Sequence, residues 1–203
     1  SGNSGALVLG SGASTDGRGG AVLVTAGSGT SGAGGRLDAH AGRSTVHTGG
    51  MVAMSSGEGT ETTSGSVMLK SANSGKTGAS GSLVFSTGTT SSGNSGLLRL
   101  GSGDATGGRS GSIVATVGSG DSGSGGELSM FAGRTTMGSG HATGGAVSVS
   151  SGESATLSSG SVTIQSANAG TDGASGKLVF SSGYATSGNS GALVLGSGAS
   201  TDG

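Results

Sequence analysis

The sequence predicts an all-β fold, a β-solenoid similar to a parallel β-helix, with coils of about 15 residues and 12 coils per long repeat of 186 residues. Three observations predict it. The chain repeats itself, aliphatic residues recur at two fixed positions in each short repeat, and a glycine closes every short repeat. The composition agrees, because 50 of the 203 residues are Gly and none is Pro, which would remove a donor from a strand ladder.

The long repeat is visible at the two ends of the chain. Ser187–Gly203 reads SGNSGALVLGSGASTDG, which is the sequence of Ser1–Gly17 letter for letter. Since the chain begins without Met and in mid-repeat, we expect it to be one period of a longer array. Residues 1–203 are therefore predicted to form one continuous solenoid segment, in which 187–203 restarts the repeat of 1–17.

Each long repeat contains two blocks of six short repeats, 6–96 and 97–191, and each short repeat is predicted to form one coil. Repeats 5 and 11 have sixteen residues, repeat 9 has nineteen because of an insertion near Met137 to Ala142, and the others have fifteen. The insertion is expected to bulge as a loop, either as neutral drift at a turn or as a periodic docking point. Short repeats 1 to 12 end at Gly20, Gly35, Gly50, Gly65, Gly81, Gly96, Gly111, Gly126, Gly145, Gly160, Gly176 and Gly191.

An aliphatic residue occupies position 2 of every short repeat and an apolar residue occupies position 4, while positions 3 and 5 vary freely. This period of two predicts a half-buried strand of about five residues. Its inward side chains form the predicted structural core: Leu7, Leu9, Val22, Val24, Leu37, Val52, Met54, Val67, Leu69, Leu83, Phe85, Leu98, Leu100, Ile113, Leu128, Met130, Val147, Val149, Val162, Ile164, Leu178 and Phe180.

Position 7 is Gly or Ala and the last position is always Gly, which predicts turns with positive φ or a close backbone approach at both places. A second extended stretch of small residues, such as Ala13–Thr15, is expected between them. Position 10 carries a partial file of threonines, which either fill a wall of small residues or present a surface array of hydroxyls: Thr15, Thr30, Thr45, Thr60, Thr106, Thr136 and Thr186.

The charge and the composition limit the classes of partner that the sequence predicts. The formal net charge of −1 gives no overall attraction to nucleic acid or anionic lipid, and no apolar run approaches the roughly 20 residues of a membrane span in this segment. The absence of Cys carries no information on the redox compartment. No cofactor is expected.

Candidate catalytic or metal-binding residues are few. Asp104 and Asp121 lie in Gly-rich segments like those of calcium-binding nonapeptide repeats, but Asp does not recur at these positions in the other short repeats. His40, His47 and His141 do not have the spacing of a metal site. No set of Ser, His and Asp recurs, so the sequence predicts that the chain is not an enzyme.

The segments SLVFSTGTTSSGNSG and AVSVSSGESATLSSG resemble the Gly/Ser/Thr-rich tandem repeats of giant secreted or cell-surface proteins, including those of algal coats and filaments, and β-solenoid adhesin stalks. The resemblance extends over the whole chain and implies an extracellular or cell-surface location. We therefore expect a structural protein, a repeat segment of a fibre or filament that provides length and stiffness. Its expected partners are other copies of itself, by coil stacking or end-to-end assembly, and glycans. The alternative is a repetitive binding surface, such as an ice-binding surface or an adhesin stalk.

Overall fold

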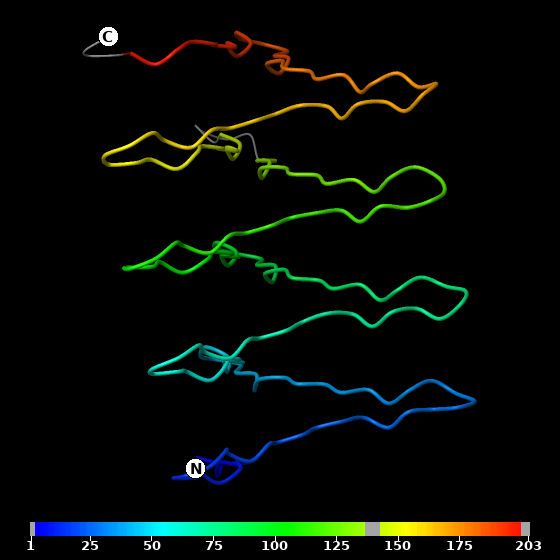
Figure 1. The fold of residues 1–203 in the computed structure, drawn as a ribbon, viewed down its shortest axis with the longest axis vertical. Coiled ribbons are helices and arrows are strands. Elements are labelled where there is room, and N and C mark those ends of the chain that lie inside the picture. The colour runs from blue at the N-terminus through cyan, green and yellow to red at the C-terminus, as the bar shows by residue number, and fades with distance from the viewer. Residues whose placement is uncertain (1–2, 137–142, 200–203) are drawn as a thin grey trace. The chain divides into compact units, whose positions relative to one another are not determined.

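A computed structural model describes residues 3–136 and 143–199, and within them the chain has no helix and no β-strand. Figure 1 accordingly draws these residues as a tube without helical ribbons or arrows. The chain divides into two compact parts, Ser1–Leu100 and Gly101–Gly203. The division falls inside short repeat 7, just after the predicted block boundary at Gly96.

The predicted all-β class and the β-solenoid are therefore wrong. In a solenoid, backbone hydrogen bonds join residues that lie about one coil apart in the sequence. Here they join the two ends of one loop: the Gly35 N–H donates to the carbonyl oxygen of Gly27 at 2.8 Å, and the same bond recurs in four further repeats. These bonds are Gly50 to Gly42 at 2.8 Å, Gly65 to Gly57 at 2.9 Å, Gly145 to Gly133 at 2.8 Å and Gly160 to Gly152 at 2.9 Å.

The physical reason lies in the small residues that follow each aliphatic segment. Glycines and serines let the chain fold back within the same repeat, and closing this short loop costs less conformational entropy than joining residues one full repeat apart. In these five repeats the N–H of the last glycine then bonds to the carbonyl oxygen of position 7. An extended segment of about six residues without a neighbour has no ladder, so it does not form a strand.

Each short repeat thus consists of an extended segment, positions 1 to 6, and a closed loop, positions 7 to the last glycine. The chain bends sharply near positions 10 to 12 of the loop. This bend replaces the second extended stretch expected around Ala13–Thr15, because those residues lead directly into it. The bends lie at 15–17, 30–32, 45–47, 60–62, 76–78, 91–93, 106–108, 121–124, 155–157 and 186–188, with a turn at 171–172.

The glycines at the two ends of the loop do not need a left-handed backbone. Positive φ values occur instead at the end of the bend, at Gly78, Gly93, Gly123 and Gly188. The expectation of positive φ at position 7 and at the last position is therefore wrong for the described residues. The alternative, a close approach, is confirmed at the last glycine, as the loop geometry below shows.

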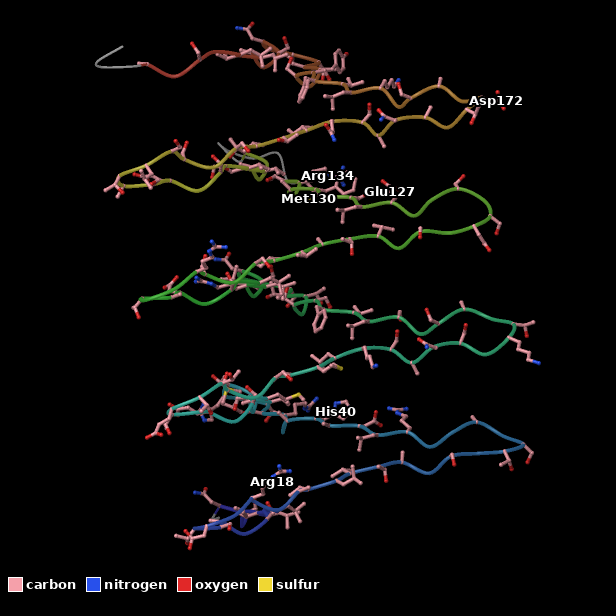
Figure 2. The ribbon with its side chains drawn as sticks, viewed as in Figure 1. Arg18, His40, Glu127, Met130, Arg134 and Asp172 are labelled. Atoms are coloured by element: carbon pink, nitrogen blue, oxygen red, sulfur yellow. The ribbon has the colours of Figure 1, made fainter. Side chains whose placement is uncertain are left out.

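The aliphatic side chains do not form a core in this chain. Among the described residues no hydrophobic side chain is buried, and all those at positions 2 and 4 are exposed. Figure 2 shows side chains projecting along the tube, Met130 among them. The wall-against-wall packing that the solenoid required is absent from the described part of the chain, because no second layer of the same chain lies against the extended segments.

Candidate functional site

The most regular feature of the structure is the neck of the loop, where the last residue of each short repeat meets the sixth. In eleven of the twelve repeats, a Cβ built on the last glycine would lie 3.1 to 3.6 Å from the Cβ of the sixth residue. In six repeats, those that end at Gly20, Gly35, Gly50, Gly111, Gly126 and Gly145, a Cβ at the last position would lie closer than 3.4 Å to a neighbouring atom, which favours Gly there. In the other six it would make an ordinary contact. The same contact thus occurs in every short repeat.

The sequence analysis did not identify the sixth position as a contact of the last glycine, although the sequence shows a preference for small residues there. A column of small residues faces the last glycine, and only one member is larger than Thr. Its members are Ser11, Ala26, Ala41, Ser56, Ser71, Thr87, Ser102, Val117, Ala132, Ser151, Ser166 and Ser182. The exception is Val117, whose Cγ1 would lie 2.6 Å from a Cβ on Gly126.

Serine hydroxyls support the bend from inside the loop. Ser44 Oγ accepts hydrogen bonds from the His47 N–H at 2.9 Å and the Val46 N–H at 3.4 Å. Ser154, at the same position of another repeat, accepts one from the Leu157 N–H at 3.0 Å. Short side chains that accept bonds from the backbone a few residues later are typical of turns.

The loop of repeat 9 keeps its neck in spite of the insertion. Gly145 bonds to Gly133 as in the shorter loops, and Thr135 Oγ1 donates to the carbonyl oxygen of Thr143 at 2.9 Å. The insertion was predicted near Met137 to Ala142, and these residues, His141 among them, lie outside the described residues. The neck therefore tolerates a longer loop, because the added residues lie between its two ends.

Six members of the threonine file lie at the start of a bend, and the residues that follow the seventh, Thr136, lie outside the described residues. All seven of its members are exposed: Thr15, Thr30, Thr45, Thr60, Thr106, Thr136 and Thr186. Their hydroxyls occur at one defined place in seven loops. This arrangement presents polar groups to solvent at the outer part of the loop.

The extended segments partly retain the predicted alternation between less exposed and more exposed side chains. In repeat 5, Val67 and Leu69 are 52% and 53% exposed, while Met68 between them is 75% exposed. Repeat 6 shows the same order, with Leu83 at 53% and Val84 at 75%. In these two repeats positions 2 and 4 therefore share the less accessible side of the segment. Repeat 1 does not show this order, since Leu7, Val8 and Leu9 are 85%, 85% and 78% exposed.

Contacts between positions 1 and 3 support the same alternation. The Arg36 Nε donates to Asp38, with its shorter contact 2.6 Å to Oδ2, and Ser129 Oγ donates to the Glu127 carboxylate. Residues two apart can touch in this way only when the backbone between them is extended. Arg36 and Asp38 are 81% and 45% exposed, so this pair is solvated.

The described residues do not gather acidic or imidazole groups into a metal site. Asp104, Asp121, His40 and His47 are all exposed. Phe131, which occupies the same position of its repeat as His40, is also exposed. Figure 2 labels His40. The structure does not bring these predicted candidates together.

A hollow of about 670 Å³ lies in the loop of repeat 6. Its lining is uncharged and comes from a single loop, so it offers hydroxyl and amide groups without an acid, base or metal ligand. The lining residues are Thr87, Gly88, Thr89, Thr90, Gly93, Asn94 and Ser95.

Comparison of the chain with family models, with curated proteins and with solved structures found no match. Within residues 3–136 and 143–199, no helix is long and apolar enough to cross a membrane.

Proposed function

We propose that the chain is a structural repeat segment of an extracellular or cell-surface fibre or filament, and that the number of repeats sets its length. The observation that carries the proposal is the neck, because all twelve short repeats place the last glycine against the sixth residue. A sequence that specifies the same local geometry in twelve successive repeats is expected to form a periodic structure. Stiffness in this proposal comes from the closed loops, since each restrains its residues within a single repeat.

The distribution of reactive residues supports a structural role over catalysis. An active site needs an acid, base or nucleophile held near its partners, and such groups have perturbed surroundings. In the described residues the charged side chains are exposed and dispersed along the repeats. The proposed role is therefore non-enzymatic, and it needs no cofactor.

A repetitive binding surface is the second candidate, and the exposed threonines at the bends favour it. Seven hydroxyls at equivalent places could act together on a repetitive ligand such as ice or a glycan coat. Freezing hysteresis of the purified chain tests the ice-binding version. Activity that disappears when Thr15 and Thr30 are changed to Val, but survives when Ser14 and Ser28 are changed to Ala, would favour this candidate.

The structural proposal is tested by the dimensions of arrays with one, two and four long repeats. Small-angle scattering at high dilution should give a maximum dimension that grows in proportion to the number of long repeats. Growth with about the 0.38 power of chain length, as in globular proteins, would overturn the proposal.

A matched control separates a specified rod from a flexible chain. Arrays of the same composition, with the residue order scrambled inside each short repeat, lose the neck contact and should scale with about the 0.5 to 0.6 power expected of flexible chains. Identical dimensions for the native and scrambled arrays would also overturn the proposal, because the repeated geometry would then contribute nothing to length.

A further inference from the structure

We propose that Tyr184 is an oxidative cross-linking site, where its phenol ring forms a carbon–carbon bond with the ring of Tyr184 in a second copy of this chain. The reactants are the two phenol rings and hydrogen peroxide. The inference goes beyond the proposed function, because a repeat segment that sets the length of a fibre needs no covalent bond between copies.

Tyr184 is the only tyrosine of the chain, and it is 88% exposed. It directly follows Gly183, position 7 of repeat 12, so it lies where the loop begins and not in the extended segment. A tyrosine in a folded protein usually packs the body of its ring against apolar neighbours and leaves only its polar tip in water. At this degree of exposure the ring itself, with the carbons ortho to the hydroxyl, is open to a partner.

The loop that carries Tyr184 allows the same loop of a second copy to come close. Residues 183–191 contain no charged side chain, so two such loops do not repel each other electrostatically. The flanking residues Gly183 and Ala185 are small, which limits the steric hindrance between two rings that meet. Both properties favour contact between the two phenols.

The coupling reaction joins two rings and consumes one molecule of peroxide. Each phenol gives up one electron and one proton, and hydrogen peroxide takes up both pairs and becomes two molecules of water. The two phenoxyl radicals combine at their ortho carbons, and the hydrogens of these carbons move to the oxygens, which restores both phenols. The product is a dityrosine, with the mass of two chains less two hydrogen atoms. Heme peroxidases are a class of catalyst for this oxidation.

The composition of the chain makes the outcome of coupling unambiguous. The chain has no Cys, so a disulfide cannot join two copies. Tyr184 has no second tyrosine to couple with in its own 203 residues, so a dityrosine must join two molecules. Exposed methionines such as Met51, at 85%, react with the same oxidant, but a sulfoxide does not join chains.

Repeat 6 supplies a loop that matches the loop of repeat 12. The two loops, 88–96 and 183–191, differ only at the three residues after the first glycine. Both bend at the same place, where Gly93 has a φ of 112° and Gly188 a φ of 114°. Thr89, the counterpart of Tyr184, is also exposed. Thr89→Tyr is therefore expected to present a phenol in the same way as Tyr184.

The experiment incubates the 203-residue chain with a heme peroxidase and hydrogen peroxide, and follows covalent products by intact mass and dityrosine fluorescence. We expect a dimer joined through Tyr184 and no larger product, because each copy carries one tyrosine. Tyr184→Phe should lose both the dimer and the fluorescence. Thr89→Tyr in the Tyr184→Phe background should regain both, which would show that the loss comes from the missing phenol and not from a change in the loop.

A parallel reaction with N-acetyltyrosine amide distinguishes access to the ring from contact between copies. A chain that couples to this small phenol but not to a second copy would overturn the inference, because the two loops then do not meet. The absence of any coupling, or a dimer that persists in Tyr184→Phe, would also overturn it. The scattering measurement uses dilute arrays without an oxidant, so failure of the cross-link leaves the proposed function to its own test.

Discussion

The loop and the extended segment of one short repeat differ in where their partners lie. The loop closes through residues of its own repeat, as Gly35 does with Gly27. The extended segment exposes its aliphatic side chains, as Val67 and Leu69 do. Loop closure is thus specified over nine residues, whereas the period of two specifies only that one side of the segment is apolar. No residue of the same repeat buries that side in the described part of the chain.

The local closure of the loop, which the extended segment lacks, should be most strongly affected by Gly59→Ala in the loop of repeat 4. A Cβ on Gly59 would lie 2.7 Å from the carbonyl oxygen of Thr63 and 2.9 Å from that of Thr62. Backbone oxygens cannot rotate away as a side chain can, so the loop must open. We expect the neck bond from Gly65 to Gly57 to be lost, at a cost of about 1 kcal/mol or more, measured as faster amide exchange at Gly65.

Gly57→Ala in the same loop is the matched control. No atom lies within 4 Å of the position that its Cβ would take, so the neck bond should persist. Equal acceleration of exchange at Gly65 in both variants would contradict the local closure of the loop.

The sequence predicted the periodicity and the close approach at the last glycine, but not which part of the chain each repeat contacts. The close approach at the last glycine follows from the absence of any other residue there, and the structure confirms it. The same small residues, such as Ser11 opposite Gly20, fit a neck inside one repeat and a contact between coils equally well. Composition could not distinguish these two arrangements, and the choice of the second led to the wrong fold.

The threonine file shows the same limit. Thr15 and Thr30 were placed in a second extended stretch because small residues surround them, but they begin the bend. Ser44 and Ser154 gave the better signal, since a serine two residues after the neck can accept a backbone bond in a turn. That signal is weak in a chain where serine is abundant.

A smaller effect is expected at the neck of repeat 8, where the sixth residue is the largest of its column. Gly126→Ala would place a Cβ 2.6 Å from Val117 Cγ1, and the valine side chain must leave its preferred rotamer, at a cost of about 1 kcal/mol. Val117→Ala should relieve this cost when combined with Gly126→Ala. Amide chemical shifts between residues 117 and 126 report the change.

The double-mutant comparison decides whether these two residues are coupled. Shifts that add without interaction in the double variant would contradict a direct contact between positions 6 and 15.

Ser154→Ala should have a more modest effect, confined to one bend. It removes the acceptor of the Leu157 N–H, a bond of 3.0 Å, and a bond of this kind contributes about 0.5 to 1 kcal/mol. Amide exchange at Leu157 should become faster, while exchange at Gly160, which bonds to Gly152 at the neck, should change little. Ser154→Thr retains the hydroxyl and should retain the slow exchange at Leu157; loss of protection with Thr would argue against the bond.

The smallest effect is expected in the extended segment of repeat 3, where Arg36 pairs with Asp38. Arg36 is largely exposed and Asp38 is nearly half exposed, so Asp38→Asn should change local stability by less than about 0.5 kcal/mol. The signal of the pair lies in its salt dependence: the Arg36 Nε–H resonance should move toward its position in Asp38→Asn as ionic strength rises, because salt screens an exposed pair. A resonance that does not respond to salt, or a large loss of stability, would mean that Arg36 and Asp38 are shielded by a partner. In that case the segment would be covered on the side of positions 1 and 3.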